Sequence, residues 1–148
     1  MSKSSDDLAV SLFSEILVVE QLARTSVARV LPKGMELSHF SVLNHLAHSA
    51  TERSPAQLAK TFNLTRGAMT NTLHKLEWAG WVHIRPDWDD ARRKMVAISP
   101  SGQSARNAAL AAIAPLISDV VTSVGEDKVR TALPVLREMR VKLRSAMD

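Results

Sequence analysis

The segment Thr65–Gly80, TRGAMTNTLHKLEWAG, constrains the fold more than any other stretch of this 148-residue chain. If it forms a helix, successive side chains are rotated by about 100° and separate into two unlike arcs. One arc is a narrow apolar stripe of Met69, Leu73 and Leu76, with Thr72 at its margin. The opposite arc carries small, hydrogen-bonding or basic residues: Gly67, Thr70, Asn71, His74 and Lys75. Because Gly, Thr and Asn are poor helix formers, this face is typical of a helix that closely approaches another surface, such as the major groove of DNA.

A second, shorter helix is predicted just before this one. Ser54, followed by a proline, suits an N-cap, and Gln57 stands three residues later, where it completes a capping box. The helix is expected to run to about Phe62, with Asn63 as its C-terminal cap and Thr65 as the N-cap of the next helix. Two short helices joined by a tight turn form a helix-turn-helix pattern, in which the second helix is expected to enter the groove.

The residues that follow predict a β-hairpin. Two stretches of alternating character, Trp81–Arg85 and Met95–Ser99, flank the polar loop Pro86–Lys94. The loop is basic near its end, and Asp90 and Arg92 are close enough in sequence to pair, which would aim the Arg more than it would stabilise the fold. A hairpin with a basic tip is a wing, whose cations can reach phosphates or a narrow minor groove.

The run from Leu58 to Gly102, LAKTFNLTRGAMTNTLHKLEWAGWVHIRPDWDDARRKMVAISPSG, resembles the winged helix-turn-helix core of the MarR family of bacterial transcriptional regulators. Two short patterns carry the resemblance. One is D-x-R at Asp90-Ala91-Arg92, followed by an alternating strand, and the other is S-x-x-G at Ser99–Gly102, which leads into a long helix. The length of the chain and the order of its predicted elements are similar as well.

The resemblance implies a homodimer that binds inverted-repeat DNA, usually as a repressor, and that releases the DNA in response to a small, often phenolic, ligand or an oxidant. It implies that Arg92 enters the minor groove and that Thr65–Lys75 supplies the groove contacts. Family wings often carry a second basic residue where this chain has Ala91, so Arg93 or Lys94 is expected to supply that contact.

The expected fold is therefore mainly α with a small β-hairpin wing. Residues 1–37 are expected to form an N-terminal dimerisation helix, residues 38–100 the winged helix-turn-helix region, and residues 101–148 C-terminal dimerisation helices of the same intertwined unit. The residues expected to contact DNA are Ser54, Gln57, Thr65, Arg66, Gly67, Ala68, Thr70, Asn71, His74, Lys75, Arg85, Arg92, Arg93 and Lys94.

The helices outside this region are expected to be long. The first should begin at Asp6 or Asp7, after a mobile polar tail Met1–Ser5, and run to about Leu31. It is apolar on two sides and therefore needs two neighbouring elements. Both could belong to the core of its own chain, or, as the resemblance favours, one could belong to a second chain. A second helix is expected to be capped by Ser38. An alanine-rich helix with a kink at Pro115, a break at Gly125 and an amphipathic last helix complete the chain.

Composition limits the classes of function. A net charge of +4 and a pI near 9.9 suit a protein that binds a polyanion. The chain has no cysteine, which excludes disulfides, thiolate metal sites and thiol-based peroxide sensing. We find no apolar run after a basic N-terminal patch and no stretch approaching ~18 uninterrupted apolar residues, so a cytoplasmic protein without a membrane partner is expected.

Several side chains allow more than one interpretation. His39, His45, His48 and Glu52 lie close together in sequence and could offer metal ligands, although histidines at the edge of a core are the simpler interpretation. Arg24, His39 and His45 could instead border a ligand cavity, as the architecture of the family suggests. Trp78 is expected to pack against another element rather than contact DNA, whereas Trp88 could either stack on a sugar or shield the hairpin.

Enzymatic activity is not expected. The sequence has no glycine-rich phosphate loop, no Ser or Cys nucleophile motif, no HExxH motif and no paired carboxylates, and no cofactor is implied. The alternative to a DNA-binding regulator is a winged-helix module whose basic face meets a protein or RNA. Salt distinguishes the two, because affinity for duplex DNA falls steeply with salt when cations neutralise phosphates.

Overall fold

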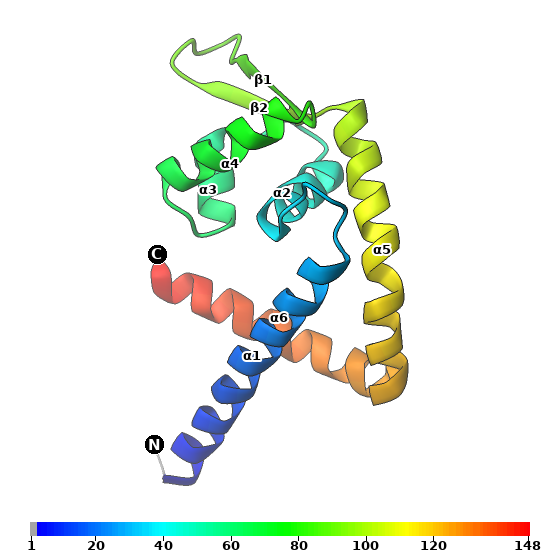
Figure 1. Ribbon diagram of the computed structural model, residues 1–148. Helices are drawn as coiled ribbons and strands as arrows, with labels where there is room; N and C mark the ends of the chain where they lie inside the picture. Colours follow the sequence, from blue (N-terminus) through cyan, green and yellow to red (C-terminus); the bar gives the residue numbers. More distant parts are fainter. Residues whose placement is uncertain (1–2) are drawn as a thin grey trace. The chain divides into compact units, whose positions relative to one another are not determined.

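The structure, a computed structural model, describes residues 3–148, and Figure 1 shows its elements. They are α1 (Lys3–Val30), α2 (Leu37–His48), α3 (Pro55–Thr61), α4 (Arg66–Trp78), β1 (Val82–Pro86), β2 (Lys94–Ile98), α5 (Pro100–Val124) and α6 (Glu126–Met147). This mainly helical fold with one two-stranded antiparallel hairpin is the fold class expected from the sequence. The chain divides after Ala112 into two compact units.

The caps predicted for the helix-turn-helix are confirmed. The backbone N–H of Gln57 donates to Ser54 Oγ at 3.2 Å, and Gln57 Oε1 accepts the backbone N–H of Ser54 at 2.9 Å. Asn63 takes the left-handed conformation, with a φ of 52°, and ends α3. Thr65 Oγ1 then accepts the backbone N–H of Ala68 at 3.1 Å and starts α4. Local hydrogen-bonding side chains therefore fix the turn between the two helices.

The apolar stripe of α4 lies in the core as predicted. Met69, Leu73 and Leu76 are at most 1% exposed, and Thr72 lies at the margin of the buried stripe. They pack in one cluster with residues from the neighbouring helices and the hairpin: Met35, Val42, Leu43, Leu46, Leu58, Ala59, Val82, Val96 and Ala109. Because only this stripe is buried, the opposite face of α4 remains in solvent.

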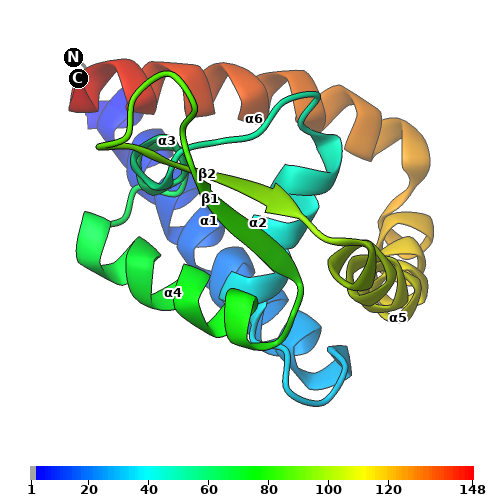
Figure 2. The same ribbon diagram turned by 90° about the horizontal axis from the view of Figure 1, so that it is seen from above.

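The hairpin lies beside α3 and α4, as Figures 1 and 2 show. Its pairs run from Val82↔Ile98 to Pro86↔Lys94, so each strand is shifted by one residue from the prediction. The reason is that the residues flanking the ladder serve the adjacent helices. The N–H of Trp81 donates to the Leu76 carbonyl at 3.0 Å, and Ser99 Oγ accepts the N–H of Gly102 at 2.9 Å.

Two expectations about the N-terminal helices are wrong. Helix α1 begins at Lys3, so Lys3–Ser5 are helical rather than a tail, while Met1 and Ser2 lie outside the described residues. Helix α2 is capped by Glu36 instead of Ser38: the Glu36 backbone is extended, and its N–H donates to His39 Nδ1 at 3.1 Å. The imidazole takes the part that Glu or Gln plays in an ordinary capping box.

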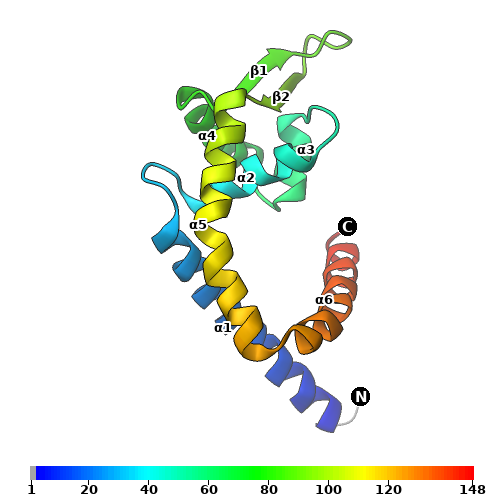
Figure 3. The ribbon, with the colours of Figure 1, turned by 90° about the vertical axis from the view of Figure 1, so that its right-hand side faces the viewer.

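The second unit contains the end of α5 and all of α6, which meet at a bend visible in Figure 3. Gly125, with a φ of 116°, provides the predicted break between them, and both helices continue through an internal proline, Pro115 and Pro134. By length and composition α5 is apolar enough to cross a bilayer, with a mean hydropathy of 1.5 in its most apolar window. The core helix of a soluble protein meets the same criterion.

Candidate nucleic-acid interface

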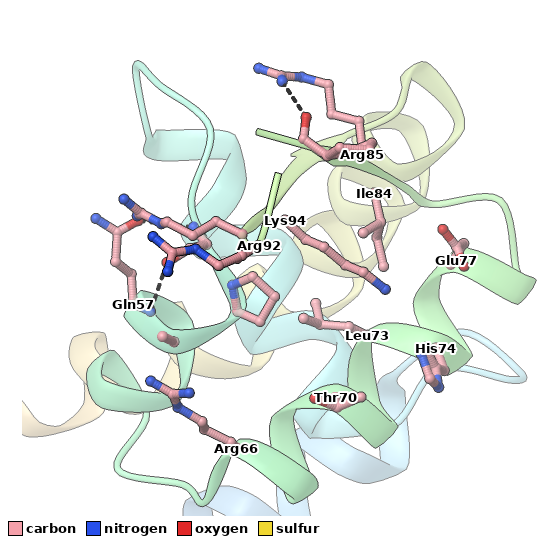
Figure 4. A pocket seen from close by; sticks show the side chains of 15 residues that line it. Gln57, Arg66, Thr70, Leu73, His74, Glu77, Ile84, Arg85, Arg92 and Lys94 are labelled. Atoms are coloured by element: carbon pink, nitrogen blue, oxygen red, sulfur yellow. Dashed lines mark hydrogen bonds between the residues drawn. The ribbon is translucent and has the colours of Figure 1, made fainter. Parts of the chain in front are cut away.

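A cleft of about 800 Å³ lies between α3, α4 and the hairpin. Figure 4 shows Arg66, Thr70 and His74 along α4, with Gln57 on α3 and Arg92 and Lys94 on the hairpin, all around this cleft. Nine of the residues expected to contact DNA line it: Ser54, Gln57, Arg66, Thr70, His74, Arg85, Arg92, Arg93 and Lys94. The tertiary fold therefore gathers residues that are up to 40 positions apart in the sequence, Ser54 to Lys94.

Positive charge is concentrated in this cleft. Arg66 comes from the first turn of α4, Arg93 is the last residue of the hairpin loop, and Lys94 begins β2. Within residues 3–148 none of these three side chains forms an ion pair, so their charges remain available to an anion. The N-terminus of α4 adds a partial positive charge beside Arg66. This combination favours a polyanion over a neutral ligand.

The hairpin loop is shaped by its aspartates. Asp87 Oδ1 accepts the backbone N–H of Asp89, and Asp90 Oδ1 accepts that of Arg92, both at 3.0 Å. Asp90 Oδ1 also accepts Arg92 Nε at 3.2 Å, so the predicted pair forms. The Arg92 side chain is 92% exposed, and such a pair adds little to stability. The acidic residues therefore fold the loop and direct Arg92 toward solvent.

Arg85 is held by the protein itself. Its guanidinium donates to Glu52 Oε1 at 2.9 and 3.2 Å and to the carbonyl of Pro86 at 2.8 Å. Its Cζ lies 4.9 Å from the centroid of the Trp88 ring, a cation–π arrangement. Trp88 thus covers part of Arg85 while its own side chain stays 80% exposed. A DNA contact by Arg85 stays a prediction, because most of its donors are already occupied.

The remaining expected contacts lie on α4 outside the cleft. Gly67 and Asn71 are exposed on the face opposite the buried stripe, and Ala68 is exposed beside the Thr65 cap. Lys75 is exposed as well, and its charge contributes to lowering the pKa of His39. A Cβ added at Gly67 would meet no atom within 4 Å, which means that a second surface can approach the backbone closely there.

The histidines and Arg24 have separate partners. His39 is buried and forms an edge contact with Trp81, and burial lowers its pKa, Lys75 adds to that effect and Glu36 opposes it. His45 packs against Phe62, and burial, followed by the charges of neighbouring basic groups, lowers its pKa. Arg24 pairs with Glu20 on exposed α1 at 2.6 Å.

The possible metal ligands do not converge. Glu52 pairs with Arg85, and His48 Nδ1 lies 2.8 Å from the Asn44 carbonyl. Among residues 3–148 there is no group of three or more His, Asp or Glu side chains that could hold a metal ion.

The structure also adds residues that the sequence analysis did not single out. Pro55, Ala56, Ile84 and Glu77 line the cleft, and Glu77 is the acidic one. The spacing of Glu77, seven residues after Thr70 and four after Leu73, places it on the cleft side of α4 and could have identified it. The expectation for Trp78 is wrong: instead of packing against another element, its side chain is 93% exposed.

Residues 33–93 match the model of the MarR family. No curated protein matches the chain. A mutant of MarR from E. coli in complex with operator DNA is similar, with a TM-score of 0.79 and 23% identity over 90% of this chain and 96% of that one. The regulator BldR from Sulfolobus solfataricus has a TM-score of 0.76 and 23% identity, over 93% and 99%.

A third similar structure is the regulator PcaV from Streptomyces coelicolor in complex with its natural ligand, with a TM-score of 0.69 and 15% identity over 87% of this chain and 89% of that one. At these identities the similarity establishes the fold. Residues 33–93 are thus similar to the MarR family, and the chain has the winged-helix fold of these structures.

Proposed function

We propose that this protein is a sequence-specific double-stranded DNA-binding regulator of transcription that acts as a repressor. One observation carries the proposal: a cationic cleft lies directly beside the exposed polar face of α4, which carries Gly67, Asn71 and Lys75. If α4 lies in the major groove and the hairpin in the adjacent minor groove, the sugar–phosphate strand between them has to pass through the cleft. Arg66, Arg93 and Lys94 would then neutralise its phosphates. The similar MarR structure in complex with operator DNA supports duplex DNA as the ligand.

The proposal includes a homodimer on an inverted repeat. Long helices at both ends of the chain leave large apolar side chains in solvent, among them Leu8, Leu12, Phe13, Leu17, Leu22, Ile117, Val120, Val124, Leu133, Leu136 and Leu143. Exposed apolar surface of this extent marks an interface. Residues 1–37 and 101–148 would therefore bind a second copy. That copy, rather than lipid, would cover the exposed apolar side chains of α5. Two-fold symmetry would place the two copies of α4 about one DNA turn, ~34 Å, apart.

Selection of bound duplexes from the genome of the source organism tests the function. The expected result is an enriched inverted repeat whose half-sites are about 10 base pairs apart from centre to centre. Light scattering should give twice the chain mass of 16.2 kDa. Failure to enrich any duplex, or a monomer at the concentrations at which DNA binds, would contradict the proposal.

Two substitutions on α4 separate base reading from charge. Asn71→Ala should relax the base preference at a cost of ~1–3 kcal/mol, because Asn is suited to a bidentate contact with adenine. Lys75→Ala should weaken binding to all sequences alike and reduce the log–log salt slope by about one. If both variants bind the enriched and a random duplex as the wild type does, the assignment of α4 to the groove is wrong.

Release by a small-molecule effector is the last part of the proposal, supported by the ligand complex of the similar regulator PcaV. Arg24, His39 and His45 are the candidate ligand residues. Binding would change the separation of the two α4 helices, with a coupling of ~1–3 kcal/mol. A panel of small phenols should therefore include one that weakens DNA binding by about 5- to 150-fold. The proposed partners are thus DNA, a second copy of the chain and the effector. The proposal places the protein in the cytoplasm and includes neither a membrane partner nor a catalytic activity.

A further inference from the structure

Trp78 is the last residue of α4, and its side chain is 93% exposed. Trp81, three residues later, is in contrast partly buried and contacts His39. An indole that is almost fully hydrated keeps a large apolar surface in water, together with one N–H donor. Such a side chain on an interface is often an anchor for the partner. The direction in which it points decides which partner that is.

Helical geometry gives that direction. Nine residues separate Trp78 from Met69 at the centre of the buried stripe, so the two side chains lie about 180° apart around the axis. Gly67 and Asn71 lie within roughly 20° of Trp78 by the same rotation. The indole therefore points toward the surface that Gly67 and Asn71 face, which is the floor of the major groove if the function proposed above holds.

Distance along the axis then selects the part of the DNA. Trp78 is seven residues beyond Asn71, or roughly 10 Å along the helix. A recognition helix contacts base edges with its N-terminal residues, so Trp78 at the C-terminal end of α4 lies farther from the bases than Asn71 and nearer the rim of the groove. The rim offers deoxyribose, thymine methyl groups and phosphates. The indole is a large apolar surface with a single N–H donor, so phosphate is the least favourable of the three.

We propose that Trp78 is a further DNA contact, in which the indole packs on deoxyribose and thymine methyl groups at the rim of the major groove. This inference rests on the function proposed above, and it assigns to Trp78 a contribution that carries no charge. An aromatic contact of this kind buries apolar surface without displacing counterions. It should therefore change affinity by the same factor at every salt concentration.

The test compares Trp78→Ala, Trp78→Phe and the wild type on a duplex that the wild type has enriched from a randomised pool. Fluorescence anisotropy over a range of salt should give a Kd for Trp78→Ala about tenfold higher at each concentration, with an unchanged log–log slope. Trp78→Phe, which keeps an aromatic face, should lie within about threefold of the wild type. Lys75→Ala is the matched control on the same helix, and it should lower the slope.

A second readout does not depend on affinity. In the variant Trp88→Phe, Trp78 is the one indole of the chain that is mostly in solvent, because Trp81 is partly buried. Its emission should shift to the blue when the duplex is added. Wild-type affinity of Trp78→Ala with unshifted emission would overturn the inference while leaving the proposed function intact. If Trp78→Ala reduced the log–log salt slope by one, Trp78 would contact a phosphate and not a sugar. If Trp78→Ala lost the dimer, Trp78 would belong to the subunit interface. Either result would overturn the inference. Failure of the wild type to enrich any duplex would instead reject the proposed function.

Discussion

Gly102→Ala should destabilise the fold strongly, although the substitution adds a single methyl group in the first turn of α5. A Cβ at residue 102 would overlap the carbonyl oxygen of Trp81 and approach its carbonyl carbon to 2.8 Å and Ile98 Cγ1 to 2.9 Å. The Trp81 oxygen cannot move freely, because it accepts the N–H of Ser99 at 2.9 Å. Ser99 Oγ in turn donates to the Gly80 carbonyl at 2.5 Å and accepts the N–H of Gly102. The methyl group would therefore push apart the junction between α4, β1 and α5.

The magnitude follows from three terms. Overpacking against backbone costs up to ~3 kcal/mol. Weakening one hydrogen bond of the buried Ser99 costs ~1 kcal/mol, and the better helix propensity of Ala returns ~1 kcal/mol. The sum is a loss of ~3 kcal/mol in the free energy of unfolding. For a chain of this length that corresponds to a Tm lower by roughly 6–12 °C.

Thermal unfolding followed by circular dichroism, at one fixed protein concentration, measures this loss. Gly67→Ala is the matched control, because a Cβ there meets nothing within 4 Å and residue 67 is an exposed position of α4. Its Tm should be unchanged or higher, since Ala is the better helix former by ~0.5–1 kcal/mol. A Tm of Gly102→Ala within about 2 °C of the wild type would refute the packing argument.

Three further predictions concern the hairpin, the buried histidine and the cleft. Glu52→Gln should lower the free energy of unfolding by about 1 kcal/mol, because it breaks the half-buried ion pair with Arg85; urea denaturation measures this, and an unchanged midpoint would mean that the pair adds nothing. Burial lowers the pKa of His39, so the imidazole binds a proton more readily in the unfolded chain, and the free energy of unfolding should fall as the pH drops below about 6.5. Urea titrations at pH 7 and 5 measure this fall, which should be smaller for His39→Gln. An equal fall in both proteins would contradict the prediction. Arg93→Ala should reduce the salt slope of duplex binding by about one, whereas Arg29→Ala on α1, far from the cleft in sequence, should leave the slope unchanged.

Much of the helix-turn-helix was predictable because its signals are local. The capping box at Ser54, the left-handed Asn63 and the Thr65 cap each depend on residues within three positions in the chain. The apolar stripe of α4 was equally predictable from its spacing. Such signals need no knowledge of the rest of the fold, which is why sequence alone was sufficient for them.

Errors arose where a tertiary contact changed the local choice. Ser38 is a better N-cap than Glu36 by residue type, yet the chain uses Glu36, because His39 is buried against Trp81 and its Nδ1 reaches back to the Glu36 N–H. Trp78 has a large apolar side chain of the kind expected in a core, but α4 ends before any neighbouring element covers it. Residue type predicted the opposite result in both cases, and only the packing of other elements could have corrected it.

The arrangement of the cleft was the least predictable property, and the structure supplies its cause. Three consecutive residues before α3 bind different partners: Glu52 pairs with Arg85 of β1, Arg53 pairs with Val96 of β2 through two backbone hydrogen bonds, and Ser54 caps α3. The hairpin and α3 are therefore joined through one short segment, on either side of the cleft. A cleft fixed in this way needs no ligand to form, so under the proposed function DNA binding would lose little conformational entropy in ordering the hairpin. The charges could be read from the sequence, but the spacing between them depends on these long-range links, which no local pattern encodes.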